Sequence, residues 1–131
     1  MKYRWSLAML FTLLAVSTVR DASSLFSYPV AVGADGYYYV LQINQLLQNG
    51  HLYFASHTPL VFYGLAALSA VIRNPVAAIK LGSIILHVLL CVSIYALVSS
   101  ITGNRLLGVL GSSIAALSGM HFYMVAEFIK N

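Results

Sequence analysis

The chain has 131 residues, of which 60% are hydrophobic and 8% charged, and its mean hydropathy is +0.86. Soluble domains carry about 25% charged residues, and a water-soluble fold this short has too much surface to cover with so few charges. The composition therefore argues against a soluble domain and predicts that lipid surrounds much of the chain. The seven basic residues are scattered, so no basic run follows a phosphate backbone and nucleic-acid binding is not expected.

The first segment, 1–28, begins with Lys2 and Arg4, continues as an apolar run over 5–19, and reaches Arg20-Asp21. A basic flank before an apolar run fits either a cleaved signal peptide or a first membrane helix with a cytoplasmic N-terminus. The run alone is about 22 Å long as a helix, which is short for the bilayer core, and no clean cleavage site follows it. We therefore favour an uncleaved membrane helix over 1–28, with Asp21 as a charge at the membrane boundary.

Residues 29–75 are predicted to form an extracytoplasmic loop that contains two helices. Glycines on both sides of Asp35 indicate a turn, and a helical pattern runs from 36 to 49. Because this helix is amphipathic, uncharged and rich in tyrosine, it is expected to lie at the membrane–water interface and to end at Asn49-Gly50. Its apolar side is predicted to contain Tyr39, Val40, Ile43, Leu46 and Leu47, and its polar side Gln42, Gln45 and Asn49.

The apolar run 60–72 follows Pro59, a good residue for a helix start, and stops at Arg73-Asn74-Pro75. As a helix it would be about 20 Å long, too short to cross the bilayer comfortably. We prefer a re-entrant helix here, and a short full span stays open as the alternative.

Two longer apolar segments, 76–99 and 106–126, are predicted to be full spans. Lys80 lies near the beginning of the first and His87 in its middle, where an ionisable group usually faces the interior of a bundle. We interpret His87 as a neutral, hydrogen-bonded packing residue rather than a proton relay. The second span carries small residues at a spacing that allows close helix approach in lipid, and it is therefore expected to pack in a bundle. These small residues are Gly108, Gly111, Ser112, Ala115, Ala116 and Gly119.

The predicted fold is all-α: a polytopic transmembrane helical bundle in a single membrane domain, with about three full spans, an interfacial amphipathic helix and a short re-entrant helix. If 60–72 is re-entrant, Asp35 and Glu127 lie outside and Arg105 lies inside with the N-terminus, as the positive-inside tendency asks. If 60–72 spans, Arg105 lies outside and the bilayer separates the two carboxylates. The charges favour the first arrangement.

Few residues can carry chemistry. Asp35 stands at the beginning of the interfacial helix, where it can cap the helix, act as a base or bind a cation, and Glu127 follows the last span. Lys80 and Arg73 can bind a lipid phosphate or extend to the interface as anchors. The histidines match no common zinc motif, the lone Cys91 permits no disulfide within the chain, and no nucleotide-binding motif occurs.

Five short motifs occur in a set order after the N-terminal helix. They are Asp35-Gly36-Tyr37-Tyr38-Tyr39, Leu47-Gln48-Asn49-Gly50, Thr58-Pro59-Leu60-Val61-Phe62-Tyr63, Ala78-Ile79-Lys80-Leu81-Gly82-Ser83 and Ala115-Ala116-Leu117-Ser118-Gly119. This order resembles the N-terminal portion of the GT-C superfamily of membrane glycosyltransferases, such as the protein mannosyltransferases and the lipid-A aminoarabinose transferases. The last three motifs are similar to that family's Pro-Pro-Leu-Tyr-Tyr, Ala-Arg-Leu-Pro-Ser and Ala-Leu-Ser-Pro segments.

The resemblance implies sugar transfer from a polyprenyl-phosphate-linked donor to an acceptor on the extracytoplasmic side. Asp35 matches the essential acid of the family's first external loop, so it is the expected catalytic base, and a divalent cation could bind there. Glu127 stands at the family's second acidic site and is the other expected catalytic residue. A cationic side chain would neutralise the departing lipid phosphate. The residues expected to bind substrate are Lys80, Arg73, His121 and Tyr37.

The chain departs from the family at three positions. Asp35 is a single acid where many members have two, Lys80 replaces an arginine and Gly119 replaces a proline. Because members have many more spans, the resemblance implies an N-terminal fragment that is inactive alone. Its expected partners are membrane lipid, the sugar donor and the remaining helices of the enzyme. The competing interpretation is a small non-enzymatic polytopic membrane protein, such as a transporter subunit or assembly factor that packs on a partner membrane subunit.

Overall fold

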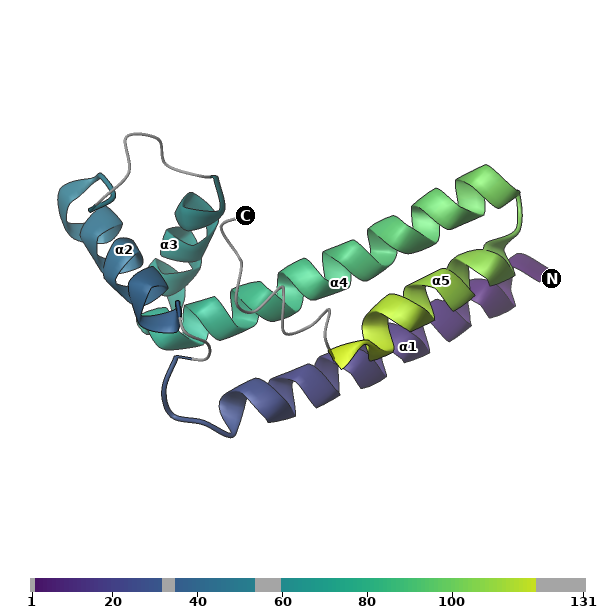
Figure 1. Cartoon of the computed structure of the whole chain (residues 1–131), viewed down its shortest axis with the longest axis horizontal. Coiled ribbons are helices and arrows are strands. Elements are labelled where there is room, and N and C mark those ends of the chain that lie inside the picture. The colour runs from purple at the N-terminus through teal and green to yellow at the C-terminus, as the bar shows by residue number, and fades with distance from the viewer. Residues whose placement is uncertain (1, 32–34, 54–59, 120–131) are drawn as a thin grey trace.

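The computed structural model describes residues 2–31, 35–53 and 60–119. These residues form helices and no strand, so the predicted all-α class is confirmed for the described part of the chain. The helices α1, α4 and α5 lie side by side along the long axis, whereas α2 and α3 pack on each other beside the beginning of α4 (Figure 1). Their bounds are Lys2–Phe26 for α1, Gly36–Asn49 for α2, Leu60–Ile72 for α3, Pro75–Thr102 for α4 and Arg105–Leu117 for α5.

Two helices in the described part are long and apolar enough to cross a membrane, Trp5–Phe26 within α1 and Pro75–Thr102. α1 has 25 residues and α4 has 28, which correspond to about 37 and 42 Å at 1.5 Å per residue. Both helices therefore exceed the hydrocarbon thickness of about 30 Å.

The helices α3 and α5 are shorter, with 13 residues each. α3 has the bounds that the sequence predicts, 60–72. α5 ends at Leu117 because Ser118 adopts an extended conformation (φ −71°, ψ 107°). The prediction of an unbroken helix from 106 to 126 is therefore wrong at Ser118, and residues 120–126 lie outside the described residues.

The connection between α3 and α4 consists of Arg73 and Asn74. Arg73 has a positive φ of 59°, and its N–H donates to the carbonyl of Ser69 at 2.7 Å, which closes the last turn of α3. The side chain of Asn74 accepts a hydrogen bond from the N–H of Ala77 at 3.0 Å, and Pro75 follows at the first helical position. This short turn fixes the direction of α3 relative to α4.

The α4–α5 hairpin packs closely because α5 presents glycine to α4. A Cβ atom added at Gly108 would lie 2.8 Å from the backbone oxygen of Tyr95 and would also overlap the hydroxyl of Ser99. Four of the small residues that the sequence singles out are buried. They are Gly108, Ser112, Ala115 and Ala116. Since α5 packs on both α4 and α1, much of this small-residue face is used within the chain.

The second packed region joins α2 to α3 and the beginning of α4. The ring of Tyr39 packs on that of Phe62 with centroids 5.9 Å apart, and both residues belong to an apolar cluster with Ile79 of α4. The predicted polar side of α2 needs one correction, because Gln42 is fully buried on the same side as Tyr39. Leu47, predicted on the apolar side, is 47% exposed.

Candidate functional site

Asp35 immediately precedes α2 and occupies its N-cap position, but its side chain makes no capping hydrogen bond. The backbone carbonyl accepts from the N–H of Tyr39 at 3.1 Å, which anchors the first turn. A Cβ atom added to Gly36 would lie 2.9 Å from the Cβ of Ala31. Only glycine permits this close approach, so Gly36 lets the beginning of α2 pack against Ala31. Asp35 is half-buried.

The tyrosines after Asp35 have different environments. Tyr37 is 63% exposed, whereas Tyr39 is fully buried against Phe62 and Tyr38 makes an edge-on contact with the ring of Tyr39 at 5.8 Å. Tyr39 therefore holds α2 on α3, and Tyr37 is the member of the trio that can contact a molecule outside the fold.

Arg73 and Lys80, both predicted to bind substrate, also lie in very different environments. Arg73 is exposed in the turn between α3 and α4. Lys80 is buried, with 4% of its surface exposed; its ammonium group donates to the backbone carbonyl of Tyr28 and lies 5.3 Å from the centre of the Phe26 ring. Lys80 therefore ties the beginning of α4 to the end of α1.

The other predicted site residues cannot be placed beside Asp35. Glu127 and His121 lie outside the described residues, as does His57. Among the described residues, no three His, Cys, Asp or Glu side chains form a group that could hold a metal ion. Magnesium is commonly bound through one or two carboxylates together with substrate phosphates. Whether Asp35 binds a cation therefore stays a prediction from the sequence.

A second polar site, which the sequence does not predict, joins α1, α4 and α5. The Oδ1 atom of Asp21 accepts from Nε and Nη2 of Arg20 at 3.0 and 2.7 Å. Its Oδ2 atom lies 2.6 Å from Nδ1 of His87. Asp21 is 1% exposed and His87 is fully buried. The expectation that Asp21 is only a boundary charge is therefore wrong, because it faces the interior of the bundle.

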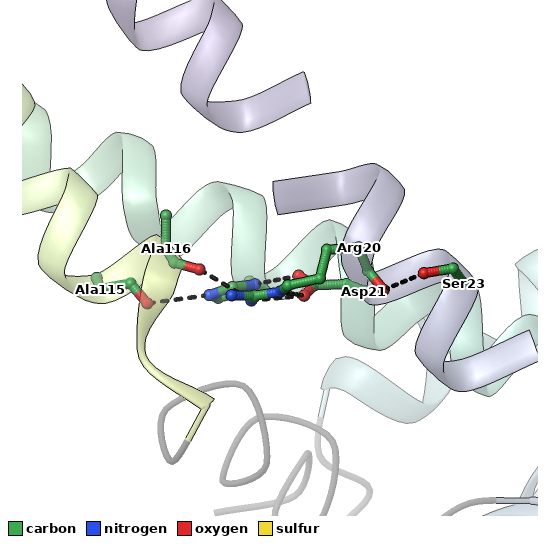
Figure 2. Close-up of polar contacts among 6 residues, drawn as sticks. Arg20, Asp21, Ser23, Ala115 and Ala116 are labelled. Atoms are coloured by element: carbon green, nitrogen blue, oxygen red, sulfur yellow. Dashed lines mark hydrogen bonds and ion pairs between the residues drawn. The ribbon is translucent and has the colours of Figure 1, made fainter. Parts of the chain in front are cut away.

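This cluster also binds the C-terminal end of α5 (Figure 2). Nη2 of Arg20 donates to the carbonyl of Ala116 at 2.9 Å, and Nε2 of His87 lies 3.4 Å from the carbonyl of Ala115. Carbonyls in the last turn of a helix lack intrahelical partners and carry the negative end of the helix dipole. Arg20 of α1 and His87 of α4 therefore contact the carbonyls at the end of α5.

An apolar groove of about 270 Å³ runs between α3 and α4. The floor is formed where Gly82 meets the side chain of Leu65, since a Cβ atom at Gly82 would overlap the Leu65 side chain. The groove is lined by Val61, Gly64, Leu65, Leu68, Gly82, Ile85 and Leu86.

Sequence periodicity contains a signal for part of this second site. Four buried residues of α1 are Leu10, Ser17, Asp21 and Leu25. Successive members are separated by about one or two helical turns, so they lie on one side of the helix. Asp21 therefore shares a stripe with apolar residues that pack in the bundle. The pairing of that stripe with His87 has no comparable local signal.

No protein-family model matches this chain, and neither does any curated protein or solved structure.

Proposed function

We propose that this chain is an integral membrane protein and the N-terminal membrane region of a GT-C type glycosyltransferase. It would transfer a sugar from a polyprenyl-phosphate-linked donor on the extracytoplasmic side, with the N-terminus in the cytoplasm. The observation that carries the enzymatic part is the position of Asp35, which lies half-buried directly before α2 and is followed two positions later by the exposed Tyr37.

Exposed apolar surface supports insertion in a membrane. Only 17% of the apolar window of α4 and 28% of that of α1 is buried, whereas the core helix of a soluble protein is mostly buried. Lipid accounts for this surface, because large apolar patches in contact with water are rare. The exposed apolar residues of α4 include Ile85, Leu89, Leu97 and Ile101.

The arrangement of the helices supports the proposed orientation. The N-terminus and the turn between α4 and α5 lie at one end of the molecule, and α2 and α3 lie toward the other (Figure 1). Arg105 begins α5 at the first end, where the basic residues Lys2 and Arg4 also begin the chain. The positive-inside rule favours this end in the cytoplasm, and Asp35 is then extracytoplasmic. α5 would begin a third span, completing the three-span bundle that the sequence predicts.

In the proposed reaction Asp35 accepts the proton of an acceptor hydroxyl. The hydroxyl oxygen then forms a bond to the anomeric carbon of the sugar, the bond from that carbon to the phosphate oxygen breaks, and polyprenyl phosphate leaves. Arg73 is the better placed cation for the departing phosphate, because it is exposed while Lys80 is committed to Tyr28. Glu127 and His121 remain candidates for the second acidic site. The groove between α3 and α4 is apolar enough to hold part of the donor's isoprenoid tail.

The competing interpretation is a non-enzymatic subunit that binds a partner through the small residues of α5. These residues do not need a partner protein to cover them, because Gly108, Ser112 and Ala116 are already buried within the chain. We therefore favour the enzymatic proposal.

The test is sugar transfer in sealed proteoliposomes by the full-length enzyme that contains this region, using a radiolabelled polyprenyl-phosphate hexose and a lipid acceptor. We expect Asp35→Asn to reduce transfer at least about 100-fold, the lower range for a catalytic acid or base. The matched control is Asn44→Ala, an exposed polar position on α2, which should transfer at the wild-type rate. Transfer by Asp35→Asn at that rate would remove the proposed base. If the wild-type chain gives no transfer, photocrosslinking of a polyprenyl-phosphate analogue to it must still depend on Arg73, or the proposal fails.

A further inference from the structure

We propose that Asp21 and His87 form a proton-binding site inside the bundle and that the proton on His87 holds the C-terminal end of α5 in place. This site is separate from Asp35 and does not depend on the proposed sugar transfer. The contacts among α1, α4 and α5 support the proposal.

The two ring nitrogens of His87 both face oxygen acceptors. Nδ1 lies 2.6 Å from a carboxylate oxygen of Asp21, and Nε2 lies 3.4 Å from the carbonyl oxygen of Ala115. A neutral imidazole has one N–H group and one lone pair, so it can donate to only one of these oxygens, whereas the protonated ring donates to both. The geometry therefore suits the protonated ring. When one proton is lost, either Asp21 or Ala115 faces a nitrogen lone pair.

The charges around His87 allow both protonation states. α1 contributes Asp21 and Arg20, α4 contributes Cys91 one turn after His87, and α5 contributes backbone carbonyls. With a neutral ring, Arg20 and Asp21 balance each other. With a protonated ring, the additional positive charge lies against the C-terminal end of α5, where the helix dipole is negative, and Arg20 is 39% exposed so that its charge can reach solvent.

Two buried hydroxyl groups lie on the helices that form the site. Ser17 lies one turn before Asp21 on α1, and Ser112 one turn before Ala116 on α5; their exposed fractions are 1% and 0%. Within the described part of the chain, neither hydroxyl has a hydrogen-bond partner. Buried polar groups of this kind commonly bind ordered water.

The proton state has a mechanical consequence for α5. In the last turn of α5, the carbonyl of Ala116 accepts a hydrogen bond from Arg20 and the carbonyl of Ala115 lies beside Nε2 of His87. The helix ends directly afterwards, at Ser118. Loss of the Nε2 proton removes one of these two interhelical contacts, so the end of α5 should move relative to α1 as the pH rises through the transition of His87.

The experiment uses the full chain in lipid nanodiscs with two measurements on the same samples. Side-chain ¹⁵N NMR reports the protonation of His87, assigned by comparison with His87→Gln. Spin labels at Val16 of α1 and Ile114 of α5, which are 59% and 75% exposed, report the distance between these helices. Cys91 stays in place, since it is fully buried and shielded from the labelling reagent.

We expect the distance distribution to change with pH, with the same midpoint as the protonation change that the NMR signal of His87 reports. In His87→Gln the distance should no longer depend on pH. The matched control is His51→Gln, an exposed histidine beyond the end of α2, which should retain the pH-dependent change. A distance that stays constant while His87 titrates, or a His87 ring that keeps one protonation state over the pH range measured, would overturn the proposal.

Discussion

The carboxylate of Asp21 and the imidazole of His87 are 2.6 Å apart although the two residues are separated by 66 positions in the sequence. One lies on α1 and the other on α4, and both are almost completely buried. Each is polar, and neither could be left in this interior without a partner at an acceptable free energy. The pair therefore fixes the position of α1 along α4.

Replacing Asp21 tests how strongly this pair holds the bundle. Asp21→Asn leaves Arg20 and His87 without their shared carboxylate. Because Arg20 is 39% exposed, the main cost is the lost acceptor of the buried His87, about 1–3 kcal/mol. We expect a loss of that size in the free energy of unfolding, measured by denaturant titration in mixed micelles. Ser24→Ala, at an exposed position of α1, is the control and should change the value little. A loss below about 1 kcal/mol for Asp21→Asn, the range of surface ion pairs, would contradict the structural role.

Three glycines in two helices, α5 and α3, should respond differently to alanine. Gly108→Ala places a methyl group 2.8 Å from the backbone oxygen of Tyr95, and overpacking of this kind typically costs about 1–3 kcal/mol. Gly111→Ala should cost less, because its nearest neighbour is a side-chain carbon of Val98 at 3.2 Å, which can shift.

Gly64→Ala is the matched control for these two variants. Nothing lies within 4 Å of the added methyl group, and alanine favours a helix over glycine by about 1 kcal/mol, so stability should stay equal or rise. The same micelle titration measures all three variants. If Gly64→Ala were as destabilising as Gly108→Ala, close packing of α4 and α5 could not be the cause.

Gln42 is expected to contribute to the stability of the fold although its side chain is polar. Its Oε1 atom accepts a hydrogen bond from the N–H of Tyr53 at 2.8 Å, which holds the chain beyond α2 against that helix. Gln42→Leu removes the acceptor and should cost about 1–3 kcal/mol, with faster hydrogen exchange at the amide of Tyr53. Gln42→Glu should cost more, because it places a charge at a fully buried position. Gln48→Leu, which is exposed, should leave the exchange rate unchanged.

The beginning of α4 depends on Asn74, whose side chain accepts from the N–H of Ala77 at 3.0 Å. Asn74→Ala removes this cap and should lower the free energy of unfolding by about 1 kcal/mol, whereas Asn74→Asp should preserve it. Thermal unfolding in detergent compares the two. Equal stability of the alanine and aspartate variants would show that Pro75 and the tight turn suffice to begin the helix.

Much of the helical framework could be predicted from local features of the sequence. α2 and α3 have the predicted bounds of 36–49 and 60–72, because each is delimited by residues with strong conformational preferences, such as Gly50 with a φ of 74°. α4 extends the predicted 76–99 by a few residues at its C-terminal end, up to the turn at Gly103.

The predictions fail where contacts between distant segments of the chain determine the structure. α5 ends at Ser118 within a segment that is apolar overall, where Ser118-Gly119 is a weak local turn signal and groups from α1 and α4 contact the last carbonyls of the helix. Gln42 is polar but follows Tyr39 by three positions and precedes Leu46 by four, so its position on the helix, more than its side chain, predicts burial. The site around Asp35 is only partly described, and its proposed chemistry rests on the family resemblance.

The neighbouring pair Arg20–Asp21 has a consequence for how the protein enters the membrane during synthesis. α1 leaves the ribosome long before His87 exists, so Asp21 must enter the bilayer without its later partner. A charged residue costs about 2.5–3.5 kcal/mol at the centre of an inserting helix, and Asp21 costs less because it lies near the C-terminal end of α1. The contact of 2.7 Å between Arg20 and Asp21 needs no other helix, so the two charges offset each other from the outset. The first helix therefore carries its own temporary counterion, and the arrival of α4 and α5 turns that local pair into the junction of three helices.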